Sequence, residues 1–188
     1  MFESIATQFA HGARRFAAAA AVRRIVRQQD GAAAVEFALV AAPFLALVFA
    51  IMETAIVFFA GQALETAVAD SSRLIMTRQA QAQGMSQAQF KDAVCAKIYG
   101  LFDCQNGVFV DVKKFSNFAD ITMPSPVDAN GNFQGLGYDP GKRGDIIVVR
   151  LFYQYPVYVS LLGYGASMSD VVGGKRLLAA TAAFRNEP

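Results

Sequence analysis

A long apolar stretch near the start of the chain limits what this protein can be. Residues 37–52 contain no charged side chain, and after Glu53 the apolar character resumes as far as Ala60. The stretch 37–60 is 24 residues long, which corresponds to roughly 36 Å of α-helix. The hydrocarbon core of a bilayer is roughly 30 Å thick. The sequence therefore predicts one tilted transmembrane helix.

The basic residues are concentrated before this stretch. Residues 1–31 carry five arginines against Glu3 and Asp30, a net charge of +3, whereas the whole chain of 188 residues carries +2. The positive-inside bias therefore predicts a cytoplasmic N-terminus, with most of the protein across the membrane. A secretory signal peptide is the competing interpretation, but its apolar region of about 7 to 15 residues follows closely on the basic residues at its start.

The composition argues against several classes of protein. A net charge of +2 is small for a nucleic-acid binder, and one His and two Cys leave few groups for catalysis or metal binding. Four residues follow the spacing of a calcium loop, but Phe133 stands where such a loop needs glycine. They are Asp128, Asn130, Asn132 and Asp139. We therefore expect no enzyme activity, no metal and no other cofactor.

The junction between leader and span carries a recognisable pattern. Gly31 is followed five residues later by Glu36 at the start of the apolar stretch, which resembles the processing site of type IV pilins and pseudopilins. The pair Glu36 and Phe37, followed by an Ala-Leu-Val run and Pro43, resembles the TadE-like minor pseudopilins of the tight-adherence (Tad/Flp) pilus system. Further segments that resemble this family are 101–104, 110–112, 144–150, 155–156 and 184–188.

The resemblance implies a maturation step and a set of partners. A prepilin peptidase would cut after Gly31, so that Ala32 becomes the N-terminus and Glu36 the fifth mature residue. Glycine, with no Cβ, lets a protease approach the backbone closely. The other implied partners are pilins or pseudopilins, inner-membrane pilus assembly proteins and the lipid bilayer. Nucleic acid is not expected as a partner. The implied location is the bacterial inner membrane, with the C-terminal domain in the periplasm.

Glu36 and Phe37 are the residues at which we expect subunits to pair. An unpaired charge costs about 2.5 kcal/mol or more at the centre of a bilayer and less near its surface, so Glu36 needs a partner. The resemblance implies that this partner is the free amine that cleavage creates on a neighbouring subunit. The alternative is that Glu36 only extends to the lipid headgroups.

Pro43 and Glu53 are candidates for contacts between helices. Pro43 removes one backbone hydrogen bond and clashes with the carbonyl of Leu39, which predicts a bend. Glu53 lies 17 residues after Glu36, or roughly 25 Å along a helix. It is expected either as an interfacial carboxylate that reaches outer water or as a contact to the helix of another subunit.

Beyond the span, the pattern predicts that the helix continues outside the membrane. Its apolar positions narrow into a stripe of Leu64, Val68, Ser71 and Ile75 at helical spacing. Nothing breaks the pattern before Gly84, so we expect one helix over residues 32–82. Its first half would be transmembrane.

A second helix is predicted to begin after Ser86, with Gln89 completing a capping box. Cys95 and Cys104 lie nine residues apart, which on one helix is too far for a disulfide. Since an isolated cysteine pair in an oxidising compartment usually bonds, this helix is expected to stop near 100–102 and let Cys104 return to Cys95.

The remainder of the chain predicts a small β-sheet. Residues 108–113 alternate as in a half-buried strand, and residues 145–153 are rich in β-branched and aromatic types that suit a central strand. Residues 177–184 are alanine-rich and favour a helix by propensity, but the pilin-like pattern implies a third strand. Residues 124–144 contain many Gly and Pro and predict a surface loop.

The predicted fold is α+β and pilin-like, a long N-terminal helix packed on a small antiparallel sheet. It divides the chain into a leader (1–31) that is cleaved, a long helix (32–82) and a periplasmic α+β domain (83–188). The leading functional hypothesis is a minor pseudopilin-like structural component of pilus assembly. The alternative is an uncleaved single-pass receptor or adaptor of the inner membrane. The sequence does not distinguish a filament subunit from a membrane scaffold or primer, and it does not identify the adhesion target.

Overall fold

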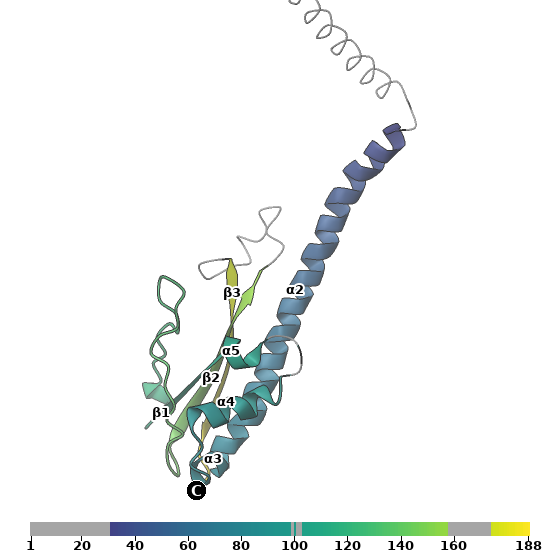
Figure 1. The fold of residues 1–188 in the computed structure, drawn as a ribbon. Helices are drawn as coiled ribbons and strands as arrows, with labels where there is room; N and C mark the ends of the chain where they lie inside the picture. Colours follow the sequence, from purple (N-terminus) through teal and green to yellow (C-terminus); the bar gives the residue numbers. More distant parts are fainter. Residues whose placement is uncertain (1–30, 99, 101–102, 158–173) are drawn as a thin grey trace, which may run out of the picture. The chain divides into compact units, whose positions relative to one another are not determined.

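The computed structural model describes residues 31–98, 100, 103–157 and 174–188 (Figure 1). The chain divides into two compact units, residues 1–48 and 49–188. The described part of the first unit is Gly31 and the N-terminal part of helix α2 (Ala32–Met76). The predicted leader lies outside the described residues except for Gly31.

Within the second unit, α2 buries one stripe of its surface. The buried residues recur every three or four positions, as the sequence pattern predicts for a helix packed on a core. They are Glu53, Val57, Ala60, Leu64, Ala67, Val68, Ser71, Ser72 and Ile75. The opposite side of this segment carries exposed polar residues such as Glu65 and Asp70. The predicted extension of the helix beyond the span is confirmed.

The helix ends six residues earlier than its sequence predicts. After Met76, Arg78 adopts a left-handed conformation (φ 62°), and the short helix α3 (Gln79–Ala82) follows. Tertiary contacts hold this break. The N–H of Glu187 donates to the carbonyl of Met76 at 2.9 Å. The side chain of Gln81 donates to the carbonyl of Pro140 at 2.7 Å. No helix-breaking residue next to Met76 marks this end in the sequence. The hydrogen-bond acceptor and donor that accompany it, Pro140 and Glu187, lie far away along the chain.

The next helix, α4 (Gln87–Cys95), begins with the predicted capping box. The Ser86 hydroxyl accepts a hydrogen bond from the backbone N–H of Gln89, while the Gln89 side chain accepts from the N–H of Ser86. The helix ends at Cys95, earlier than the predicted stop near residues 100–102. A short helix, α5 (Cys104–Gly107), leads into the sheet, and the Asp103 carboxylate accepts a hydrogen bond from the N–H of Asn106 at its start.

Three strands form an antiparallel sheet in the order β1 (Val108–Phe115), β2 (Ile146–Pro156) and β3 (Lys175–Arg185). β2 is central, as its composition predicts, and Pro156 ends it. β3 confirms the predicted third strand over 177–184 despite its alanine content. Pairing with β2 along all eleven residues of β3 outweighs the weak helix preference of the isolated segment.

One face of the sheet packs against α2 and forms the core. Val110, Leu151 and Ala180 lie opposite one another on the three strands. All three belong to the same buried hydrophobic cluster as Leu64 of α2. Phe90 of α4 closes this cluster and is fully buried.

The other face of β1 and β2 is covered by the long connection between them, which includes the short 3-10 helix η2 (Phe118–Asp120). The ring of Phe133 stacks on that of Phe109, with the centroids 3.9 Å apart. The side chain of Gln154 donates to the carbonyl of Gly131 at 2.6 Å. The predicted loop at residues 124–144 is confirmed, and it also shields the outer face of β2.

Candidate membrane anchor and assembly site

The predicted processing site stands at the beginning of α2. The helix begins at Ala32, one residue after Gly31, and residues 31–36 are exposed. A methyl group in place of the Gly31 hydrogen would meet no atom within 4 Å. This position therefore has no internal packing reason to be glycine, and its role in cleavage stays a prediction.

Glu36 and Phe37 lie on the second turn of α2 and point away from any packed surface. Phe37 is 74% exposed. Glu36 is exposed, and within the described residues it forms neither a hydrogen bond nor an ion pair. Both side chains are thus available to lipid or to another subunit. Which of these they contact is untested.

The first part of α2 presents an apolar surface that the rest of the described chain does not cover. Thirteen large hydrophobic side chains between residues 35 and 59 are exposed. They are Val35, Phe37, Leu39, Val40, Phe44, Leu45, Leu47, Phe49, Ile51, Met52, Ile56, Phe58 and Phe59. Water-soluble surfaces rarely carry so large a continuous apolar patch. Among the described residues, α2 is the one helix long and apolar enough to cross a membrane.

Pro43 and Glu53 occupy different environments on this helix. Pro43 is exposed and lies inside α2, which runs without interruption to Met76. Glu53 is only 7% exposed. Part of the expectation for Glu53 is therefore wrong, because its carboxylate is shielded by the folded chain rather than reaching open water. Burial requires the long-range fold, which the local sequence does not report. A contact of either residue to another subunit stays a prediction.

The predicted disulfide between Cys95 and Cys104 is confirmed. The two sulfur atoms are bonded, and the Cα atoms lie 5.5 Å apart. Cys104 returns to Cys95 because α4 ends at Cys95 itself. The side chain of Gln105 donates to the Asp92 carboxylate at 3.0 Å and adds a second contact between α5 and α4.

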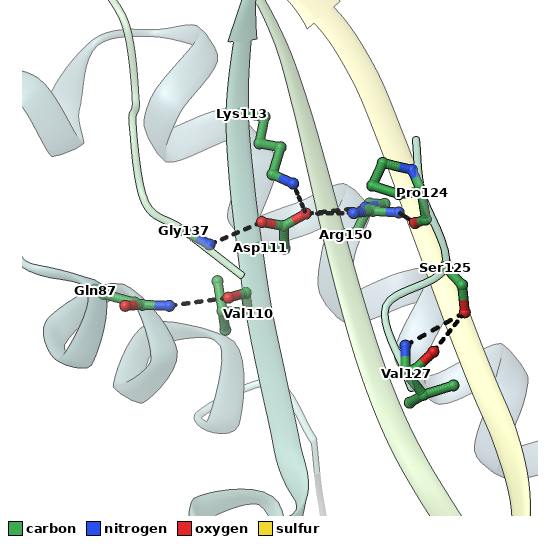
Figure 2. Close-up of polar contacts among 9 residues, drawn as sticks. All are labelled: Gln87, Val110, Asp111, Lys113, Pro124, Ser125, Val127, Gly137 and Arg150. Atoms are coloured by element: carbon green, nitrogen blue, oxygen red, sulfur yellow. Dashed lines mark hydrogen bonds and ion pairs between the residues drawn. The ribbon is translucent and has the colours of Figure 1, made fainter. Parts of the chain in front are cut away.

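A buried ion pair joins β1 to β2, and the sequence analysis missed it (Figure 2). The guanidinium of Arg150 donates to Asp111 Oδ2 through Nη2 at 2.6 Å and through Nε at 3.0 Å. The side chain of Asp111 is fully buried. The alternation of residues 108–113 predicted only a half-buried strand and gave Asp111 no partner. The available signal was its position directly opposite Arg150, which only the strand register reveals.

The ion pair also holds the long connection against the sheet. Asp111 Oδ1 accepts a hydrogen bond from the N–H of Gly137 at 2.9 Å, and Arg150 Nη1 donates to the carbonyl of Pro124 at 3.3 Å. Figure 2 shows both contacts on either side of the pair. Each charge therefore has several partners, as a buried ion requires. The arrangement of the Asp111–Arg150 ion pair indicates a structural role.

Acidic side chains in the loops accept hydrogen bonds within turns. The pKa of Asp128 is lowered, chiefly because its carboxylate accepts a hydrogen bond from the backbone N–H of Asn132. The pKa of Asp103 is lowered in the same way by the side chain and backbone of Asn106. The described residues contain no group of three or more His, Cys, Asp or Glu that could hold a metal ion.

The described residues form an α+β fold with one N-terminal apolar helix, which fits a membrane anchor. Residues 31–73 match the model of the family described as TadE-like protein. This match supports the resemblance noted at the Gly31 junction and is consistent with a TadE-like protein of Tad pilus systems. No curated protein and no solved structure matched the chain significantly.

The matched family suggests a functional class. TadE-like proteins are structural pilus components rather than enzymes. The match suggests a component associated with Tad pili, which implies interaction with other pilus components and with the membrane. The apolar helix fits a single-pass membrane protein of such a system.

Proposed function

We propose that this protein is a minor pseudopilin-like structural component of Tad/Flp pilus assembly, matured by a prepilin peptidase that cuts between Gly31 and Ala32. Residues 37–60 would cross the inner membrane, with the N-terminus in the cytoplasm and residues 83–188 in the periplasm. The observation that carries the proposal is that the family match and helix α2 begin at nearly the same residue. The family match begins at residue 31, and α2 begins at residue 32.

The local structure of the junction supports cleavage. Gly31 is exposed, and three alanines, residues 32–34, follow it. Little side-chain bulk therefore surrounds the bond that would be cut. Five arginines in residues 1–31 favour a cytoplasmic position for the N-terminal side of this bond.

Glu36 gives the cleavage a consequence for assembly. Cleavage would convert the backbone N–H of Ala32 into a charged amine. An exposed carboxylate at the edge of the apolar stretch would then have a cationic partner on a neighbouring copy or on another pilin. Pairing lowers the cost of holding either charge near hydrocarbon. Processing would thus create the group that Glu36 binds.

The disulfide supports the proposed topology. Disulfides such as Cys95–Cys104 form and persist in oxidising compartments, which include the bacterial periplasm, and are rare in the cytosol. The bond lies in the region 83–188, on the opposite side of the apolar stretch from the arginines.

Replacement of the glycine tests the processing step. We expect Gly31→Val to accumulate at full length and to abolish piliation, because the added side chain obstructs the protease while meeting no atom within 4 Å in the chain itself. Gly61→Val is the matched control, since Gly61 also lies in α2 and has no atom within 4 Å of the added Cβ position. Immunoblots should show processed Gly61→Val. Normal maturation of Gly31→Val would refute the proposed site.

Replacement of the carboxylate separates assembly from maturation. Glu36→Leu should be inserted and cut but should not co-purify with other pilus subunits or support filaments, while Glu36→Asp should be intermediate because its reach is shorter. Glu65→Leu is the control, because Glu65 is exposed on the same helix beyond the apolar stretch. Normal filaments with Glu36→Leu would restore the alternative in which Glu36 only reaches the headgroups.

A further inference from the structure

A hollow lies at the outer edge of β1, beside the first turns of α4. Its volume is about 250 Å³, and α4, β1 and the connection that follows β1 all contribute to its lining. Gln87 and Ala88 are exposed, so the hollow lies at the surface. Most of the lining side chains are apolar and suit an apolar group. The lining includes Gln87, Ala88, Lys91, Phe109, Val110 and Leu136.

The chain itself covers the edge of β1 on both sides of the hollow. On one side, the N–H of Val112 donates to the carbonyl of Gly137 at 2.8 Å, and the carbonyl of Val112 accepts from the N–H of Asp139 at 2.9 Å. On the other side, the N–H of Val108 donates to the carbonyl of Cys104 in α5. An extended strand that passed along this edge would have to displace these segments. The space between them suits a single residue at the end of a chain.

The hollow contains one backbone donor that is not used. Residues two apart on an antiparallel strand turn their backbone groups to the same side, so Val110, like Val112, turns its N–H and carbonyl away from β2. The carbonyl accepts a hydrogen bond from the side chain of Gln87 at 2.9 Å (Figure 2). The N–H has no acceptor within the described residues, and Val110 is only 3% exposed. Because an unpaired buried N–H is costly, a ligand should bring an acceptor oxygen here.

Lys91 adds a positive charge to the hollow. Its Nζ lies 5.8 Å from the centroid of the Phe109 ring, and it forms no hydrogen bond or ion pair within the described residues. The pKa of Asp103 is lowered chiefly by hydrogen bonds to Asn106 and least by the charge of Lys91. Both carboxylate oxygens of Asp103 bond to Asn106. The ammonium group and the unused N–H together favour a carboxylate as the polar part of a ligand.

We propose that the hollow binds the C-terminal residue of a partner protein that ends in a large apolar side chain. That side chain lies against Ala88, Phe109 and Leu136, and the terminal carboxylate accepts a hydrogen bond from the N–H of Val110 and pairs with Lys91. Capture of a terminal carboxylate by backbone groups is an established mode of peptide recognition. A C-terminal residue carries an apolar side chain and a carboxylate on one Cα, which suits a hollow of about 250 Å³. This inference goes beyond the proposed pilus role and does not depend on cleavage of the leader.

Peptide binding to the full-length protein in a non-ionic detergent tests the proposal. The probe is the hexapeptide Gly-Ser-Gly-Ser-Gly-Leu with a fluorophore at its N-terminus and a free C-terminal carboxylate, and fluorescence anisotropy reports its binding. We expect saturable binding that weakens about tenfold or more when the carboxylate is amidated, because charge-assisted hydrogen bonds are lost. Replacement of the terminal leucine by serine should weaken binding by a similar factor, because apolar burial is lost.

Two pairs of variants assign the binding to the hollow. Lys91→Met should weaken binding of the free-acid peptide about tenfold and leave that of the amidated peptide unchanged. Lys97→Met is the matched control, because Lys97 is exposed and does not line the hollow. Ala88→Phe should abolish binding by filling the hollow, whereas Ala96→Phe, at an exposed position directly after α4, should not. Unchanged melting temperatures would verify that the variants are folded.

Three results would overturn the proposal. The first is an absence of saturable binding by the free-acid peptide. The second is equal binding by an amidated peptide with glutamate before its leucine, because the ligand would then be a side-chain carboxylate rather than a chain end. The third is an equal loss of binding in Lys91→Met and Lys97→Met, which would attribute binding to overall charge rather than to the hollow.

Discussion

Both halves of α2 contain many apolar residues, but they have opposite surroundings. Leu47 is 60% exposed, whereas Leu64, on the same helix, is fully buried. In the first half, large apolar residues occur on all sides of the helix. In the second half they form a stripe, and polar residues occupy the opposite side. Apolar content alone does not separate lipid from protein core as the surrounding medium, but its distribution around the helix does.

Two glutamates on α2 mark the same contrast. Glu36 is exposed at the beginning of the apolar half, while Glu53, farther along, is buried within the folded chain. A carboxylate at the membrane edge is free to pair with another subunit. A carboxylate enclosed by its own fold has its environment set by that fold. Sequence spacing gives the distance between the two residues but not the surroundings of either.

The largest expected effect comes from placing one charge in each half. Leu64→Asp should destabilise the folded unit by more than about 4 kcal/mol, because it buries an unpaired carboxylate. Leu47→Asp should leave that unit within about 0.5 kcal/mol of wild type but cost about 2.5 to 3.5 kcal/mol of membrane insertion near the bilayer centre. Thermal unfolding in detergent measures the first effect, and alkaline extraction of membranes measures the second. Equal unfolding by both variants would remove the distinction between the halves.

A second prediction sharpens the contrast between buried and exposed polar contacts. Arg150→Met should destabilise the protein by about 3 to 5 kcal/mol, because it leaves the buried Asp111 carboxylate without its main partner. Lys114→Met removes the exposed ion pair with Asp139, whose nitrogen and oxygen lie 3.5 Å apart, and should cost less than about 1 kcal/mol. Denaturant titration compares the two. A loss for Arg150→Met no larger than for Lys114→Met would contradict the structural role of the buried pair.

The disulfide gives a smaller effect, confined to the unit of residues 49–188. Cys104→Ser should lower stability by about 2.5 to 3 kcal/mol according to the loop-entropy account of a short closed loop. Thiol labelling of the unreduced wild type should find neither cysteine reactive. Quantitative labelling of both thiols without reduction would refute the bond. Membrane extraction should not differ between Cys104→Ser and wild type, since the bond lies outside the apolar stretch.

Much of the fold could be predicted because its signals are local. The long apolar helix, the buried stripe around Leu64, the capping box at Ser86 and the central strand all follow from periodicity, composition or short spacings. The disulfide followed from the isolated cysteine pair and the expected oxidising compartment, and the end of the helix before Cys104 followed from the distance that nine helical residues would impose. The third strand required the resemblance, because its alanines favour a helix.

The features that the sequence misjudged depend on residues far apart in the chain. At the end of α2, Glu187 bonds to Met76, and Pro140 bonds to Gln81 in α3, and neither partner is visible locally. Glu53 is buried only once the chain has folded. Alternation places Asp111 on the side of β1 opposite the valines but does not tell what covers that side. The long connection between β1 and β2, which covers this face, and Arg150, which lies opposite Asp111, determine the surroundings of Asp111.

The mass of the mature protein tests the central claim most directly. We predict that the wild-type chain, extracted from membranes of cells that assemble the pilus, begins at Ala32 and retains the whole of α2, including the apolar half. Intact mass spectrometry with sequencing of the N-terminal peptide would show this. A chain that still carries the arginine-rich leader would contradict the proposed maturation and favour an uncleaved membrane receptor or adaptor. A chain cut within or after residues 37–60 would contradict the membrane anchor itself.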